Sequence, residues 1–106
     1  MDSHNRIAEF PLAQHHEIAE IFADHLTGST FHENTLRLEF AVTRLEDAAG
    51  GNAPPHGERH VAARLVLSVP CTVDLLNRLN KVAAQLAKAG IVTLKGGLAR
   101  STRELN

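Results

Sequence analysis

Two stretches of alternating apolar and polar residues constrain the fold of this chain more than any other feature of its sequence. One runs from Thr35 to Leu45 and the other from His60 to Val69. A period of two is typical of a β-strand with one covered face and one open face. Glycine, asparagine and proline lie between the stretches, in Glu46–Arg59. We therefore predict a hairpin whose two strands are joined by a mobile loop, residues 46–59.

The spacing of the two stretches also predicts how the strands pair. A symmetric register places Phe40 opposite Leu65 and Leu38 opposite Leu67. This pairing keeps the apolar side chains of both strands on one face, as a half-buried hairpin requires.

The second face of this hairpin is less polar than a solvated sheet surface usually is. In the symmetric register it carries Glu39 and Arg64 as diagonal neighbours. Four apolar residues share this face, and these are Ala41, Leu45, Ala62 and Val66. We predict that they form an interface with a second subunit, since a symmetric dimer is the commonest way to cover such a surface. The alternative is that the segment His15–Leu26 covers the face within one chain.

A long amphipathic helix is predicted from Pro70 to Ala89. Six apolar residues recur there at spacings of three and four, and these are Leu75, Leu76, Leu79, Val82, Ala83 and Leu86. Pro70 suits the first turn, Thr72 can cap the N-terminus, and Gly90 can end the helix in a left-handed conformation. Leu79 lies at the centre of the apolar stripe, so we expect it in the core.

Residues 15–28 fit either of two secondary structures. Four apolar residues recur at helical spacing, and these are Ile18, Ile21, Phe22 and Leu26. A strand from Glu20 to Thr27 is the alternative, although its alternation is poor. The choice between helix and strand stays open on this pattern alone.

The two ends of the chain carry weaker patterns. We expect residues 1–14 to be a flexible N-terminal segment and residues 95–106 to be a fraying C-terminal tail. The short apolar run Ile91–Leu94 is either a final strand or a packed extension. Residues 15–94 then form a single domain.

Composition excludes several functions. Aromatic residues make up 4% of the chain, with no tyrosine or tryptophan, so no aromatic platform is available to stack nucleobases. The net charge of −1 argues against attraction to nucleic acid or to an anionic membrane. Cys71 is the single cysteine, which excludes an intramolecular disulfide. Together with an N-terminus that lacks an apolar segment, this predicts the reducing cytoplasm.

Seven histidines raise the question of a metal site. His16, Glu20 and Asp24 would follow one another along a helix, but they do not match a known metal-binding motif. His56 and His60 flank the second strand, and we expect them to be surface residues. Cys71 falls in the first helical turn, where we expect it to be small and buried rather than nucleophilic. We assign no catalytic, cofactor-binding or metal-binding residue, and we expect no cofactor.

Several short motifs together resemble a small bacterial family of uncharacterised proteins. They are Ile21-Phe22-Ala23-Asp24, Leu36-Arg37-Leu38-Glu39-Phe40, Arg64-Leu65-Val66-Leu67-Ser68 and Asp74-Leu75-Leu76-Asn77-Arg78-Leu79. The match covers roughly residues 20–90. The chain departs from the family in Phe22-Ala23-Asp24, where Tyr-Ala-Asn is usual, and in its long loop. The resemblance implies that residues 20–30 are a strand, in an order of elements loosely similar to SecB-type export chaperones.

These observations together favour one architecture and three functions. We expect an α+β fold, in which a three-stranded antiparallel meander packs against one long C-terminal helix. The leading function is a non-enzymatic oligomeric interaction or assembly module that forms a homodimer or binds another protein. The second is a chaperone-like or peptide-binding protein that uses an exposed sheet edge or an apolar groove. The third is a metal-binding protein or enzyme that uses histidine and acidic residues.

Overall fold

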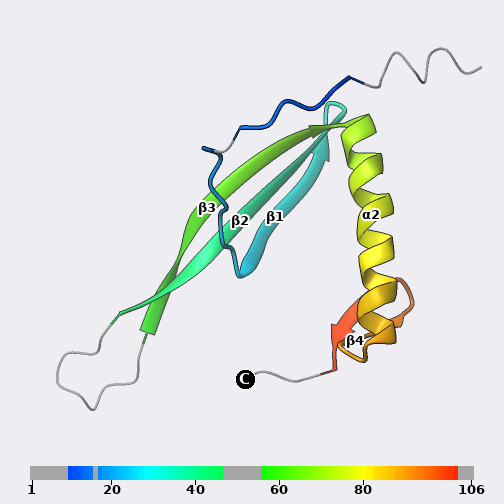
Figure 1. The fold of residues 1–106 in the computed structure, drawn as a ribbon. Coiled ribbons are helices and arrows are strands. Elements are labelled where there is room, and N and C mark those ends of the chain that lie inside the picture. The colour runs from blue at the N-terminus through cyan, green and yellow to red at the C-terminus, as the bar shows by residue number, and fades with distance from the viewer. Residues whose placement is uncertain (1–9, 16, 47–55, 103–106) are drawn as a thin grey trace, which may run out of the picture.

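The computed structural model describes residues 10–15, 17–46 and 56–102, which form an α+β fold (Figure 1). Three antiparallel strands pair in the order β1-β2-β3. Their bounds are β1 (His25–His32), β2 (Thr35–Glu46) and β3 (His56–Ser68). Helix α2 (Val69–Lys88) follows β3 directly, and a small second sheet ends the described chain. The predicted meander followed by one long helix is confirmed.

The segment before β2 is a strand and not a helix. β1 begins at His25, and residues 17–24 contain no helix. The strand alternative for residues 15–28 is therefore correct, although the strand runs from His25 to His32 and not from Glu20 to Thr27. Asp24 extends the pairing by one bond, because its backbone N–H donates to the carbonyl of Ala41 over 3.0 Å. Pairing with β2 decides the outcome, since a short isolated helix has little stability of its own.

A tight two-residue turn joins β1 to β2. Glu33 and Asn34 both adopt positive φ angles, 52° and 60°, which is the backbone that a two-residue hairpin turn of this hand requires. The Thr35 hydroxyl donates to the carbonyl of His32 over 2.8 Å and closes the turn.

The register between β2 and β3 differs from the predicted one by two residues. Leu38 pairs with Leu65 and Phe40 pairs with Ala63. From Thr35 to Phe40 this shift of two keeps the side chains on their predicted faces, because side chains alternate with period two. A further irregularity follows Phe40, beyond which Ala41 pairs with Val61.

The connection between these strands is also shorter than predicted. β2 extends to Glu46 and β3 starts at His56, so the expectation of a mobile loop over residues 46–59 is wrong at both ends. Residues 47–55 of that predicted loop lie outside the described residues. The extra pairing at the ends of β2 and β3 gives a longer hairpin than the alternation alone indicated.

Hydrogen bonds define both ends of α2. The Ser68 hydroxyl accepts from the backbone N–H of Cys71 over 3.3 Å, so Ser68 is the N-cap and the predicted cap, Thr72, is one turn too late. At the other end Gly90 has a φ of 79°. The N–H of Ile91 donates to the carbonyl of Leu86 over 2.9 Å, as is typical of a glycine-terminated helix. The predicted stop at Gly90 is confirmed.

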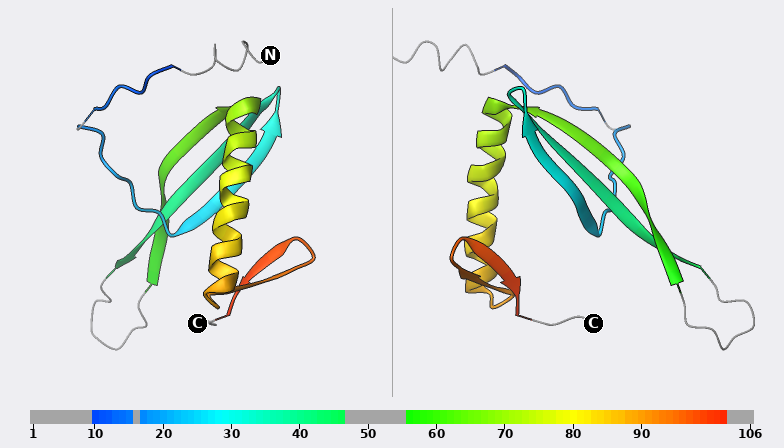
Figure 2. Two further views of the ribbon diagram at one scale, coloured as in Figure 1. Left: turned by 45° about the vertical axis from the view of Figure 1, so that its right-hand side comes forward. Right: turned by 180° about the vertical axis from the view of Figure 1, so that it is seen from behind.

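The expected packing of the helix on the sheet holds within a single chain only where α2 leaves β3, and not along the rest of the helix. From its junction with β3, α2 runs away from the sheet, and the distance between them grows along the helix (Figures 1 and 2). No residue of α2 is buried, and Leu79, expected in the core, is 51% exposed. Among the described residues, Ala41 alone is a buried apolar residue, at 1% exposure.

A second hairpin replaces part of the predicted C-terminal tail. β4 (Val92–Lys95) pairs with β5 (Leu98–Ser101) across Gly96 and Gly97, whose φ angles are 60° and 78°. The Thr102 hydroxyl donates to the carbonyl of Gly90 over 2.7 Å and ties the hairpin to the end of α2. The expectation of a tail over residues 95–106 is therefore wrong up to Ser101, and residues 103–106 lie outside the described chain.

Replacing Gly90 by alanine is expected to destabilise the protein by roughly 1 kcal/mol, because a left-handed backbone is costly for a residue with a Cβ atom. Apart from Gly90 and its two chain neighbours, nothing lies within 4 Å of the position of that Cβ, so the cost comes from the backbone alone. Gly90→Asn is the matched control and should lose less, since asparagine tolerates this conformation better. Urea denaturation measures both, and equal stability of Gly90→Ala and wild type would contradict the cap.

Replacing Glu33-Asn34 by Asn-Gly is expected to raise the free energy of unfolding by roughly 1 kcal/mol, because these residues suit a turn with two positive φ angles. Thermal denaturation of the double variant Glu33→Asn, Asn34→Gly measures the gain. A lower midpoint than that of wild type would show that this turn has another conformation.

Candidate functional site

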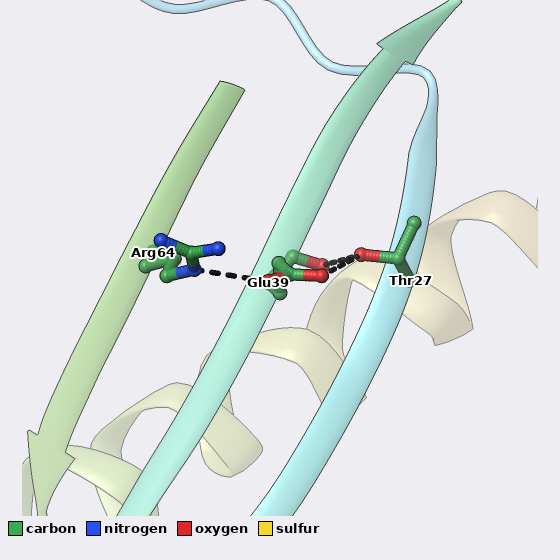
Figure 3. Close-up of polar contacts among 3 residues, drawn as sticks. All are labelled: Thr27, Glu39 and Arg64. Atoms are coloured by element: carbon green, nitrogen blue, oxygen red, sulfur yellow. Dashed lines mark hydrogen bonds and ion pairs between the residues drawn. The ribbon is translucent and has the colours of Figure 1, made fainter. Parts of the chain in front are cut away.

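A chain of polar contacts crosses the three strands of the main sheet (Figure 3). Arg64 on β3 donates from Nε to Glu39 Oε2 on β2 over 2.9 Å. From β1, the Thr27 hydroxyl donates to Glu39 Oε1 over 2.8 Å and lies 3.1 Å from the Glu39 carbonyl oxygen. Both carboxylate oxygens of Glu39 are therefore held, one from each neighbouring strand.

The local backbone explains how these three side chains meet. Glu39 and Arg64 pair directly across β2 and β3, whereas the symmetric register made them diagonal neighbours. In β1 the register shifts between Leu26 and Gly28, so Thr27 is an extra residue in a β-bulge. The bulge turns the Thr27 hydroxyl toward the carboxylate, and Gly28, which pairs with Glu39, has no side chain to cover it.

A shallow depression of about 300 Å³ surrounds this polar chain. The residues that line it come from all three strands and are Gly28, Ser29, Thr30, Arg37, Leu38, Glu39, Arg64, Leu65 and Val66. The side chain of Arg37 has no hydrogen-bond or ion-pair partner among the described residues. The charged residues that line the depression are thus two arginines and one glutamate.

The environment of Glu39 lowers the pKa of its carboxyl group below the usual value of 4.5. The hydrogen bond from Arg64 is the main cause and the one from Thr27 is the second, because both favour the charged form. Glu39 is thus an anion with one hydrogen bond on each carboxylate oxygen. It is suited to holding three strands in register, while Arg37 is the charged group of the depression that is free to bind an anion.

The structure places the four predicted interface residues in different surroundings. Ala41 is buried by its own chain, and Ala62 is half-buried. Leu45 is 74% exposed near the far end of the hairpin, and Val66 is 56% exposed beside the depression. The structure does not bring the four together into one compact patch, and their contact with a second subunit stays a prediction.

The histidine and acidic residues singled out in the sequence are dispersed. His16 lies outside the described residues, and the Asp24 carboxylate accepts from the backbone N–H of Thr43 over 3.2 Å. His56 lies 2.8 Å from a carboxylate oxygen of Glu46. His60 lies 3.3 Å from one of Glu58. No three potential metal ligands cluster anywhere in the described ranges.

Helix α2 carries Cys71 and is the long helix of the described chain. Cys71 is exposed in the first turn of α2, so the expectation that it is buried is wrong. Within the described part of the chain, no helix has both the length and the hydrophobicity that crossing a membrane requires.

The sequence did not single out Thr27 as part of a site. Its one signal was the glycine that follows it, because a glycine inside a strand often marks a bulge. Gly28 could not predict a bulge while residues 15–28 could still be a helix, because a β-bulge forms only in a strand that pairs with another strand.

No protein-family model, curated protein or solved structure matches this chain. The resemblance to a small bacterial family and to SecB-type chaperones therefore stays a prediction.

The stability that the charged form of Glu39 contributes is expected to disappear in acid. Because its folded pKa is lowered, this stability is fully present above the unfolded value and is lost as the pH falls through the folded one. Wild type should therefore be more stable than Glu39→Gln at pH 7, and the difference should shrink well below pH 4.5. Denaturation of both across pH 2–7 measures this, with Glu20→Gln as the control. A difference independent of pH would contradict the role of Glu39.

Proposed function

We propose that this protein is a non-enzymatic interaction or assembly module that works as a homodimer. The observation that carries the proposal is the open apolar side of α2, a helix of 20 residues with no buried side chain. Its central residues Leu76, Leu79 and Val82 are 55%, 51% and 43% exposed. Apolar side chains in such number on one helix face mark a surface that another molecule covers.

The energetics of folding support the same proposal. Ordering one residue costs roughly 1–2 kcal/mol of conformational entropy, which apolar burial must offset. Within one chain the buried apolar core of the described residues is Ala41. A second copy would bury the remaining apolar surface, and dimers of this kind often have no stable folded monomer. Two-fold pairing is also the commonest form of assembly.

The proposed module acts through protein surfaces, without nucleic acid, membrane or cofactor. The net charge of −1 supports this, because no strong field attracts polyanions. A single, exposed cysteine suits a reducing compartment, so we place the protein in the cytoplasm.

If the protein is a dimer, the midpoint of its thermal unfolding is expected to depend on the protein concentration. For a folded dimer in equilibrium with unfolded chains, the midpoint rises as the protein concentration rises. Calorimetry over a hundredfold range of concentration, together with sedimentation equilibrium, measures this. A cooperatively folded monomer with a constant midpoint would overturn the proposal.

A chaperone-like or peptide-binding protein is the second candidate, and the sheet edges favour it. In the order β1-β2-β3, no described strand pairs with the outer edge of β1 or of β3. Such edges can add an extended peptide as a further strand. Hydrogen exchange in the presence of a reduced, unfolded polypeptide distinguishes the candidates. Protection confined to β1 or β3 favours peptide binding, whereas no protection leaves the assembly module.

A further inference from the structure

The apolar side of α2 is covered at its two ends and open in its middle. Thr72 and Leu75 are half-buried where the helix leaves the sheet. Ala83 and Leu86 are half-buried near the other end, where β4 packs against the helix. Between these ends lies the open stretch, which we define as Leu76, Leu79 and Val82.

The sheet turns its apolar face toward the same side as α2. Figure 3 shows α2 behind the strands and the side chains of Thr27, Glu39 and Arg64 in front of them. Side chains alternate along a strand, so the residues that flank Glu39 on β2 point to the side of the helix. These residues and their partners on β3 form the apolar sheet face, which is Leu36, Leu38, Phe40, Leu65 and Leu67.

The open stretch has the width of one α-helix. Leu76 and Val82 are six residues apart, which is about 9 Å along a helix at 1.5 Å per residue. An α-helix with its side chains is about 10–12 Å across. A helix that crosses α2 at Leu79 would therefore fill the space between the sheet junction and the β4–β5 hairpin.

We infer that the occupant is α2 of a second copy, so that the two helices cross at Leu79 in a two-fold dimer. This inference rests on the proposed homodimer and specifies its interface. Each copy has the same open stretch, and one two-fold contact covers both at once. In the described chain, α2 is also the one helix that could enter.

A contact between the two helices alone is too small for a stable interface, so the apolar sheet face must also be part of it. Even the whole face of a helix of 20 residues, about 30 Å long and 10 Å wide, has a footprint of only roughly 300 Å², and a crossing at Leu79 uses part of it. Stable interfaces bury roughly 800 Å² on each partner. A helix that enters on the side of the apolar sheet face contacts that face as well as α2, and both surfaces then contribute.

Two matched aspartate substitutions test which surface forms the dimer. Leu79→Asp is expected to raise the dimer dissociation constant about 30-fold or more, because it places a charge at the centre of the contact. Val66→Asp is the matched control and tests the alternative interface predicted from the sequence, since Val66 has a similar exposure, 56%, on the opposite face of the sheet. It should leave the dissociation constant within a fewfold of wild type. Sedimentation equilibrium measures both.

Cysteine cross-linking tests the geometry without a charge that could prevent folding. In a Cys71→Ser background, Leu79→Cys should form a disulfide between copies under mild oxidation. Crossing helices with axes 8–10 Å apart bring Cα atoms at the crossing within disulfide range. Asn77→Cys is the control, because position 77 lies about 200° around the helix from position 79. We expect no cross-link from it.

The outcomes separate this inference from the proposed function. A wild-type protein that is monomeric overturns the proposed homodimer and the interface with it. A wild-type dimer that Val66→Asp dissociates and Leu79→Asp does not would keep the homodimer and overturn the interface. Dissociation by Phe22→Asp alone would show instead that the segment before β1 forms the contact. Cross-linking at position 77 and not at 79 would likewise overturn the crossing.

Discussion

The direct passage from β3 into α2 is the constraint on which the rest of this structure depends. Ser68 is both the last residue of the strand and the cap of the helix, so no loop separates the two elements. A connection without a loop leaves the helix little freedom to fold back on the sheet. The helix therefore runs away from the sheet that precedes it (Figure 2). Both elements keep their apolar surfaces open as a result.

In this arrangement the two faces of the sheet differ in chemistry. On one face, Glu39 joins three strands through Arg64 and Thr27, which holds the register where all three strands meet. On the other face, apolar side chains lie toward the helix and are at most half-buried within one chain. The Glu39 carboxylate finds its partners within one chain, whereas the apolar face stays partly open. The homodimer proposed above would complete it.

Much of the fold could be predicted from the sequence, and the site could be predicted only in part. The alternation of residues around Glu39 predicted the correct strand faces. The symmetric register was two residues off, so it did not predict that Glu39 pairs directly with Arg64. Alternation cannot detect a shift of two, because such a shift preserves both faces. The pair Gly96-Gly97 is typical of a two-residue hairpin turn, so the sequence did contain a signal for the β4–β5 hairpin that the predicted tail left out.

By itself the sequence determined the local structure of this protein. The period of β2 and β3, the apolar stripe of α2 and the glycine that ends it follow from short-range sterics and from side-chain periodicity. Tertiary structure alone decided that residues 25–32 are a strand, since pairing with β2 outweighs their ambiguous pattern. It also decided that Leu79 is exposed rather than buried. Periodicity shows which side of a helix is apolar, but only the direction of the chain at Ser68 decides what lies against that side.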